Sequence, residues 1–489
     1  MKRKLCFLLL SAVIILLSAC RDKKAVSSEL LYGFTSEPST LDPLNPANTA
    51  DGRSILFNVF EGLVKPDTSG KMNLCLSQTL KIEQGGRIYI FTLRDGVRFH
   101  DGSLLTPDDV KFSLDTAIAA GFTGLDVIED VSIVGANQIK ITLKKPDPDF
   151  LPYLTTGIVK AGNTEREKKI TGTGPFFIES YTIQQNLILK KFKDYRQPDM
   201  PHLEKVTIVF FANSDALLVA LRGGGINGAS ITGPMAAQLD HRKFNIIDSF
   251  SAAVQLLALN NKVPPLNDIN VRRAINYGID VQDIIDTAFF GVGIPSGSPV
   301  IPGLSAYYER SLEYPYEPDT AISLLSNKKF DLEITVPSNY SMHVDTAQVI
   351  ANQLSKVGIN VIIKQVDWAT WLSDVYFGRN YMATIISLDS PIVSPRSFIS
   401  RYYSTSGGNF INFSNPGFDK IYNSILTETD ETKRIKLYRD AQRTITENAA
   451  SVYIQDILYY KAVSKSFSGI LDYPLYAVDF ASIYEIKEN

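Results

Sequence analysis

The chain has few of the side chains on which imidazole and metal chemistry depend. Its 489 residues include only four histidines, three cysteines and two tryptophans, against 23 tyrosines and 26 phenylalanines. The histidines are scattered, at His100, His202, His241 and His343, and none has a second ligand at metal-binding spacing. This composition favours binding over catalysis, and we predict neither a metal site nor a cofactor.

The sequence motifs of common enzymes are also missing. There is no G-x-S-x-G, H-E-x-x-H, Walker A or C-x-x-C motif. Gly223–Gly228 matches G-x-G-x-x-G, but it follows a helical run instead of a strand and is interpreted as a helix end. Asp147 and Asp149 lie in a Pro-rich loop, which predicts solvated turn residues and not a catalytic pair. We therefore predict that the protein is not an enzyme.

Neither sign of charge is in large excess. The chain has 49 Lys and Arg against 52 Asp and Glu, a formal net charge of −3, and no long basic run. Nucleic-acid binding is not expected from such a balance. Hydrophobic residues make up 45% and charged residues 21%, as in ordinary globular proteins, and the length predicts two to four domains.

The long hydrophobic run of the sequence stands at its N-terminus. Three basic residues, Lys2–Lys4, precede an apolar run over residues 5–17, which is shorter than the about 20 residues of a permanent membrane helix. The run ends in Leu17-Ser18-Ala19-Cys20, which resembles a bacterial lipobox, where the Cys is acylated and the chain is cut before it. We expect a signal peptide over residues 1–19, lipidation at Cys20 and a polar tether over residues 20–28. An ordinary signal peptide with Cys20 incidental is the alternative.

Cysteine is too scarce for a disulfide in the mature chain. Cys6 leaves with the signal peptide and Cys20 is assigned to lipid, so Cys75 remains alone. Its apolar neighbours, Leu74 and Leu76, predict a small buried hydrophobic side chain and not a nucleophile.

The body of the chain alternates strand-like and helix-like segments without internal repeats. A helix is predicted to begin at Thr106-Pro107-Asp108-Asp109, because an N-cap residue, a Pro at the first position and acids in the first turn favour a helix start. Strands are expected at 89–94, 139–143, 187–192, 206–211 and 253–260, and further helices at 215–221, 270–277, 281–289, 318–325, 346–357, 368–376 and 433–447. This mixture predicts an α/β protein of several lobes.

Several segments in this order resemble the family 5 extracellular solute-binding proteins, the peptide- and nickel-binding receptors of ABC importers. The stretch Phe91–Leu114, FTLRDGVRFHDGSLLTPDDVKFSL, is similar to the family signature. It is supported by Glu37–Pro43, Phe60–Leu63, Gly172–Phe176, Asn270–Tyr277 and Pro416–Asp419. The similar segments extend over almost the whole mature chain.

This resemblance implies a two-lobed, periplasmic-binding-protein type II-like fold of three domains, with a ligand cleft between domains I and III. Domain I would comprise residues 29–50, 173–262 and 466–489. Domain II would comprise residues 51–172 and domain III residues 263–465. Domain III would close over the ligand about a two-stranded hinge, and ligand binding would favour the closed form.

The resemblance also implies a ligand site in which an extended peptide adds as a strand between two segments. One segment is Ser36, Glu37 and Pro38, and the other spans residues 387–393. Relatives usually hold the peptide's amino group with an Asp in the second segment, but here Pro391 occupies that position. Asp389, two residues earlier, is the nearest acid, and it is either the replacement or a surface residue.

Further departures concern the other anchors. Dipeptide-selective relatives carry an Arg where this chain has His343-Val344-Asp345. Arg396 and Arg401 could instead hold a ligand carboxylate, with exposed cations as the alternative. Trp368 and Trp371 would face one way on a helix, with Trp371 lining the cleft and Trp368 in the core, or with both in the core.

The leading hypothesis is therefore a monomeric, lipid-anchored receptor outside the cytoplasm. It would bind oligopeptides and deliver them to an ABC permease and its ATPase. The alternatives are another cargo in the same fold, such as a nickel chelate or an oligosaccharide, and a sensor or chaperone role that uses the same cleft.

Overall fold

The computed structural model describes residues 28–486, apart from residues 47, 123, 327, 339, 391 and 393. The predicted signal peptide, Cys20 and Pro391 lie outside the described residues. Among the residues described, no helix has the length and apolar character needed to cross a membrane.

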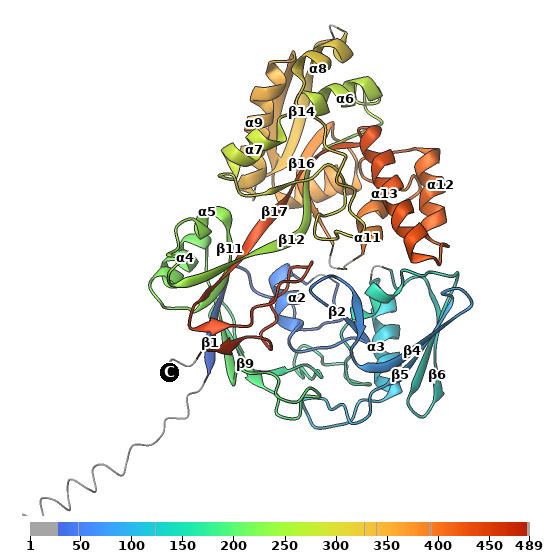
Figure 1. The fold of residues 1–489 in the computed structure, drawn as a ribbon, viewed down its shortest axis with the longest axis vertical. Coiled ribbons are helices and arrows are strands. Elements are labelled where there is room, and N and C mark those ends of the chain that lie inside the picture. Colours follow the sequence, from blue (N-terminus) through green and yellow to red (C-terminus); the bar gives the residue numbers. More distant parts are fainter. Residues whose placement is uncertain are drawn as a thin grey trace, which may run out of the picture.

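The described chain forms two lobes, drawn one above the other in Figure 1. We define the first lobe as residues 28–249 and 458–486, and the second lobe as residues 254–456. One eleven-stranded sheet runs through both lobes in the order β15-β14-β16-β12-β17-β11-β1-β10-β9-β8, with β13 paired to β17. The expected two-lobed α/β fold is confirmed.

The first lobe combines part of this sheet with a four-stranded sheet of order β4-β5-β7-β6, against which α3 packs. Its elements are β1 (Glu29–Phe34), α2 (Ala50–Leu56), β2 (Val64–Pro66), β3 (Met72–Leu74), β4 (Ser77–Glu83), β5 (Ile88–Leu93), α3 (Pro107–Ala119), β6 (Ile128–Gly135), β7 (Gln138–Leu143), the 3₁₀-helix η1 (Leu151–Thr155), β8 (Phe176–Thr182), β9 (Asn186–Lys191), β10 (Lys205–Phe210), α4 (Ser214–Arg222), β11 (Gly228–Thr232), α5 (Gly233–Ala236), β18 (Phe467–Ser468) and β19 (Tyr484–Glu485).

The second lobe surrounds the other part of the large sheet with helices. Its elements are α6 (Ile269–Tyr277), α7 (Val281–Ala288), β13 (Ile294–Pro295), α8 (Pro318–Leu325), β14 (Phe330–Pro337), α9 (Ser341–Ser355), β15 (Ile359–Val366), α10 (Trp368–Thr370), the π-helix η2 (Trp371–Phe377), β16 (Ala383–Asp389), α11 (Pro395–Ile399), the 3₁₀-helix η3 (Ser400–Tyr402), α12 (Pro416–Ile425) and α13 (Glu431–Glu447).

Two long antiparallel strands, β12 (Phe244–Leu259) and β17 (Ser451–Ser464), connect the lobes. In the first lobe Ser249 lies opposite Tyr459, and in the second lobe Val254 lies opposite Asp456. The register shifts between these two stretches. Such an irregularity bends a strand and weakens local pairing, so this point is the natural hinge.

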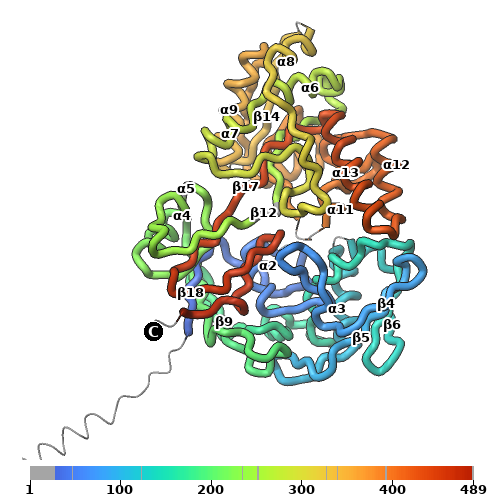
Figure 2. The backbone as a smooth tube through the Cα atoms, in the orientation of Figure 1, coloured from blue at the N-terminus to red at the C-terminus, as the bar shows by residue number. Residues whose placement is uncertain are grey.

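The backbone trace returns to the first lobe at the C-terminal end of the chain (Figure 2). The ring of Phe480 packs edge-on against Tyr32 of β1, at 5.3 Å between centroids. Val478 and Ile483 belong to the same buried cluster. The two ends of the described chain thus complete one core.

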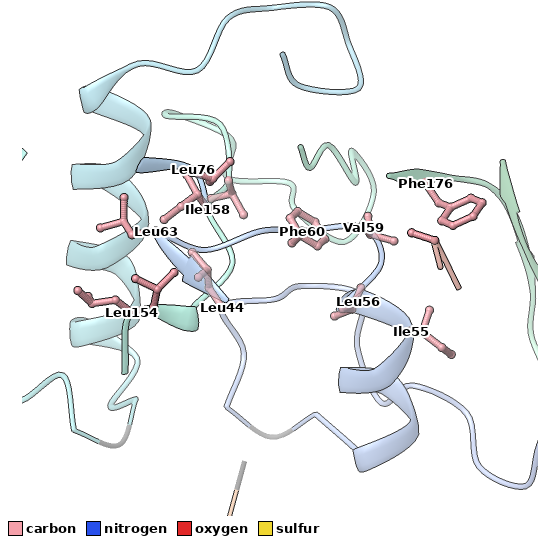
Figure 3. Close-up of a cluster of buried hydrophobic side chains, with 14 of the residues drawn as sticks. Leu44, Ile55, Leu56, Val59, Phe60, Leu63, Leu76, Leu154, Ile158 and Phe176 are labelled. Carbon is pink, nitrogen blue, oxygen red and sulfur yellow. The ribbon is translucent and has the colours of Figure 1, made fainter. Parts of the chain in front are cut away.

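That core also joins the segments that the resemblance assigns to domains I and II. Figure 3 shows Leu44 and Phe176 in one cluster with side chains from residues 55–158, among them Leu56 and Phe60. The second lobe has two core clusters of its own. Domains I and II therefore form one packed unit, while the exact domain boundaries stay predictions.

Candidate ligand-binding site between the lobes

The first turn of α2 lies where the two lobes meet, and it carries two oppositely charged residues. Asp51 is buried, and its Oδ2 accepts hydrogen bonds from the backbone N–H of Ser36, at 3.1 Å, and from the Ser36 hydroxyl, at 2.6 Å. The hydroxyl of Tyr476 donates to Oδ1 at 2.7 Å. Burial raises the pKa of Asp51, although these hydrogen bonds act in the opposite direction.

Arg53, on the same turn, reaches across to the second lobe. Its Nη2 lies 3.5 Å from Oδ2 of Asp389, at the end of β16. Both side chains are largely accessible, with 39% of Arg53 and 61% of Asp389 exposed. An accessible ion pair contributes little to stability, so a charged ligand could replace either partner at low cost.

Tyr340 of the second lobe also faces this region. Burial, and the nearby Asp51 and Tyr340, raise the pKa of Tyr459 on the hinge strand β17. Tyr459 in turn packs edge-on against Tyr476, at 5.9 Å. Aromatic and charged groups of both lobes therefore converge beside the hinge.

The structure places the tryptophan pair opposite to the expectation. Trp371 is 2% exposed, its indole N–H donates to Oγ1 of Thr384 at 2.9 Å, and it belongs to a core cluster. Trp368 stacks on it at 5.0 Å and is 39% exposed. The expectation that Trp371 lines the cleft is wrong, because the strand β16 covers that face and leaves Trp368 outside.

Arg396 is neither an exposed cation nor a free anchor for a ligand carboxylate. Its Nη1 lies 2.5 Å from Oδ2 of Asp147, its Nε donates to the Tyr153 hydroxyl at 3.0 Å, and its side chain is 7% exposed. Asp147 and Asp149 were predicted to be solvated turn residues, and this is also wrong. Asp147 is buried and the Asp149 side chain is 11% exposed, and each pairs with a second-lobe arginine.

The remaining predicted residues have structural partners. Glu37 accepts hydrogen bonds from the hydroxyl of Tyr181, at 2.8 Å, and from the backbone N–H of Gln184. Pro38 is buried, while Ser36 is exposed beside Asp51. Arg401 donates from Nη2 to the backbone oxygen of Asp389, at 3.0 Å. Of the predicted set, Ser36, Asp389 and Arg401 thus lie around the first turn of α2.

No group of three or more His, Cys, Asp or Glu in the described residues could hold a metal ion. His100 accepts from the backbone N–H of Gly172 at Nδ1, and its Nε2 lies 3.0 Å from the backbone oxygen of Gly174. His343 is buried, with Nδ1 3.0 Å from the amide nitrogen of Gln255. Both are structural residues.

Asp51, Arg53 and Tyr340 were not predicted as site residues. Asp51 and Arg53 are two residues apart on one short helix, which offers no local pattern that distinguishes them from ordinary surface charges. Their closeness in sequence to Glu37–Pro43 could have indicated them, because the short helix that follows this segment returns to the same edge of the sheet.

A cavity of about 180 Å³ lies elsewhere, inside the second lobe. Its lining includes Asp280, Glu313, Tyr314 and Tyr453. None of the predicted ligand-binding residues contributes to it, so we do not assign it to the interlobe site.

Comparison with known proteins agrees with this architecture. Over 479 residues the chain is 25% identical to the probable D,D-dipeptide-binding periplasmic protein DdpA of Escherichia coli K12, covering 91% of this chain and 92% of the relative. The ABC transporter substrate-binding protein CtaP of Listeria monocytogenes superposes with a TM-score of 0.84 at 23% identity, covering 94% and 99% of the two chains. The oligopeptide-binding protein AppA of Bacillus subtilis, solved with a nonapeptide, gives 0.78 at 21% identity, with 94% and 99% covered.

Residues 71–410 match the family described as bacterial extracellular solute-binding proteins, family 5, middle region. This match covers more than half of the chain and confirms the family that the segments of the sequence indicate. The chain, whose two lobes meet at the ion pair between Arg53 and Asp389, therefore belongs to the family 5 bacterial extracellular solute-binding proteins.

Proposed function

We propose that the protein is a receptor of an ABC importer that binds peptides between its lobes and delivers them to a permease and its ATPase. The observation that carries the proposal is the ion pair between Arg53 of the first lobe and Asp389 of the second. Arg53 stands on the same helix turn as Asp51, the partner of Ser36. This arrangement offers both a carboxylate and a guanidinium to a ligand that enters beside the hinge. A peptide with free ends carries the two complementary charges.

The peptide class is further supported by the names of the relatives. One is a probable D,D-dipeptide-binding protein, and another was solved with a nonapeptide. A peptide could add its main chain beyond the end of β16, where regular pairing with β12 stops at Asp389. Main-chain bonding gives affinity with little sequence selectivity.

Within this site we assign Asp389 to the ligand's amino group and Arg53 to a ligand carboxylate close to that amino group, because the two side chains are only 3.5 Å apart. Each charge is satisfied by the other when the site is empty. A bound peptide replaces this pair with two ligand contacts, so neither charge is left unpaired. Arg401 would fix the Asp389 segment through its bond to the backbone oxygen.

Calorimetric titration with a free peptide and with the same peptide acetylated at its amino end tests the assignment. Asp389→Asn should weaken the free peptide about tenfold or more, since about 1.4 kcal/mol corresponds to tenfold. The acetylated peptide should bind the unaltered protein poorly and be nearly indifferent to the substitution. A coupling energy near zero between the amino group and Asp389 would remove Asp389 from the site. If a mixed peptide library does not bind at all, the peptide cargo itself is refuted.

We further propose that Cys20 carries a lipid and anchors the receptor at the outer side of a membrane. The support is the Leu17-Ser18-Ala19-Cys20 sequence after the apolar run. Cys20→Ala should produce an uncleaved or soluble form. A mature-length Cys20→Ala protein that still enters the detergent phase would contradict lipidation at this residue.

A further inference from the structure

A second contact between the lobes lies on the loop that follows β7, and it contains no predicted ligand-binding residue except Arg396. Asp147 of this loop pairs with Arg396 of α11 at 2.5 Å, with 8% and 7% of the two side chains exposed. Asp149 pairs with Arg434 of α13 at 2.8 Å, with 11% and 10% exposed. Each pair joins the first lobe to the second.

Neutral groups complete both pairs. The guanidinium of Arg396 lies over the ring of Tyr153, 4.8 Å from its centroid, and its Nε donates to the Tyr153 hydroxyl at 3.0 Å. The hydroxyl of Tyr438 donates to Oδ2 of Asp149. Nη1 of Arg434 donates to the backbone oxygen of Glu428, at 3.1 Å. The four charged side chains are therefore almost fully removed from water.

These groups lose their partners when the lobes separate. The two tyrosines belong to different core clusters, because Tyr153 packs in the first-lobe core and Tyr438 in a second-lobe core, and each contacts a charged residue of the opposite lobe. The polypeptide chain itself passes between the two lobes only through β12 and β17. Opening the hinge would expose all four charges, and closing it would bury them again.

We propose that these two ion pairs, together with Tyr153 and Tyr438, form a latch that holds the lobes closed in the absence of cargo. The latch consists of Asp147, Tyr153, Arg396, Asp149, Arg434 and Tyr438. It is separate from the pair Arg53–Asp389, which is accessible and lies beside the hinge. The latch sets how often the empty protein opens to admit a ligand.

This arrangement has a consequence for binding. A ligand changes an open–closed balance only through its different affinity for the two forms. A latch that acts on the empty protein shifts the balance before any ligand is present, and the apparent affinity is scaled by the fraction of protein in the binding-competent form. The latch thus changes the apparent affinity for the ligand without contacting the ligand.

Small-angle X-ray scattering of the ligand-free protein tests the latch. Asp147→Asn combined with Asp149→Asn removes both acids while keeping their shape. We expect the unaltered protein to be closed and this double variant to have a larger radius of gyration, with the open-to-closed ratio raised at least tenfold. Arg434→Lys keeps the charge and should open the protein less than Arg434→Gln.

The control is Glu129→Gln, which removes an exposed ion pair with Arg87 inside the first lobe. It should leave the radius of gyration unchanged. If the double variant does not fold, as judged by circular dichroism, the two Arg434 variants decide the question. An unaltered protein that is open without ligand, or equal radii for Arg434→Gln and the unaltered protein, overturns the latch. The measurement needs no ligand, so its outcome is independent of whether the cargo is a peptide.

Discussion

At the scale of single residues, His100 and His343 show how burial suppresses the titration of a histidine near neutral pH. Burial lowers the pKa of each to about 4. His100 already accepts a hydrogen bond at Nδ1, from the backbone N–H of Gly172. His343 likewise faces the amide nitrogen of Gln255. Burial disfavours the charged ring and keeps both pKa values low, and a proton on Nδ1 of either ring would also displace a hydrogen-bond donor.

We predict from these values that the protein loses stability in mild acid. The unfolded-state pKa of histidine is about 6.5, so the folded protein resists protonation that the unfolded chain accepts. The stabilising contribution is fully present above pH 6.5 and is lost as the pH falls from about 6.5 towards 4. His343→Gln keeps a polar side chain beside Gln255 but cannot titrate. Urea unfolding at pH 7.5 and 5.0 should show a pH difference smaller by about 1 to 2 kcal/mol in this variant.

An exposed histidine provides the control for this experiment. His241 is exposed, and His241→Gln should leave the pH difference of the unaltered protein as it is. Identical pH differences for His343→Gln and the unaltered protein would mean that His343 is not a source of the acid sensitivity.

Residue roles were the least predictable part of the site. Asp147 lies in a Pro-rich loop whose composition indicates a solvated turn, but its partner Arg396 is 249 residues away in sequence. The same holds for Asp389 and Arg53, which are separated by 336 residues. Local sequence describes turn propensity and cannot describe a charge that arrives from the other lobe. Helical spacing likewise left open whether Trp371 lines the cleft or lies in the core, and the structure buries it, with its indole N–H bonded to Thr384 of β16.

At the scale of elements, local patterns predicted most helices well. The helix expected from Thr106 onward is α3, and Pro107 is its first residue. The helix expected at 318–325 is found at Pro318–Leu325. Caps and prolines act within one turn, so they are readable from the sequence alone.

The long hinge strand β17 was missed for a physical reason. Most residues of Ser451–Ser464 are buried on both faces, so the sequence has no alternation of polar and apolar positions. Only residues 253–260 were predicted as the strand that became β12, because the first half of β12 belongs to the first lobe and the second half to the second lobe. A strand shared by two lobes has no single buried face, so its sequence lacks the alternation that would indicate a strand.

The first turn of α3 gives a prediction at this scale. Oδ2 of Asp109 accepts from the backbone N–H and the hydroxyl of Thr106, both at 2.7 Å, and Oδ1 accepts from the backbone N–H of Ala161 at 2.8 Å. Asp109→Ala removes three hydrogen bonds accepted by a buried carboxylate and should cost about 2 to 3 kcal/mol of unfolding free energy. The measurement is urea unfolding at neutral pH.

The neighbouring Asp108 is the matched control. It stands in the same turn but is exposed, so Asp108→Ala should cost only about 0.5 kcal/mol through the helix dipole. Equal losses for the two alanine variants would show that the buried hydrogen bonds of Asp109 do not stabilise the helix start.

At the scale of the whole molecule, the two lobes and their family were predictable because the resembling segments extend along almost the entire chain. The balance between open and closed forms was not, since it depends on ion pairs that no single segment contains. The latch and the ligand act on the same hinge. Their effects should therefore be separable by adding ligand to latch variants.

We predict that a saturating peptide mixture closes the Asp147→Asn, Asp149→Asn protein. The ligand contacts on both lobes are intact in this variant, so the radius of gyration should fall on adding peptide, and the melting temperature should rise. The unaltered protein should show the rise in melting temperature with a smaller change in radius. A latch variant that stays open with peptide, while its melting temperature rises, would mean that the peptide binds one lobe only.

The packing of both ends of the described chain in one core determines when the protein can fold. Tyr32 near the N-terminal end packs against Phe480 near the C-terminal end, and Val478 and Ile483 lie in the same cluster. A chain that emerges with its N-terminus first therefore presents β1 long before its packing partners arrive. The second lobe, whose residues are contiguous, can fold before the last segment has emerged. The first lobe must wait for the final residues, so the protein cannot reach its full shape until the last described segment is present.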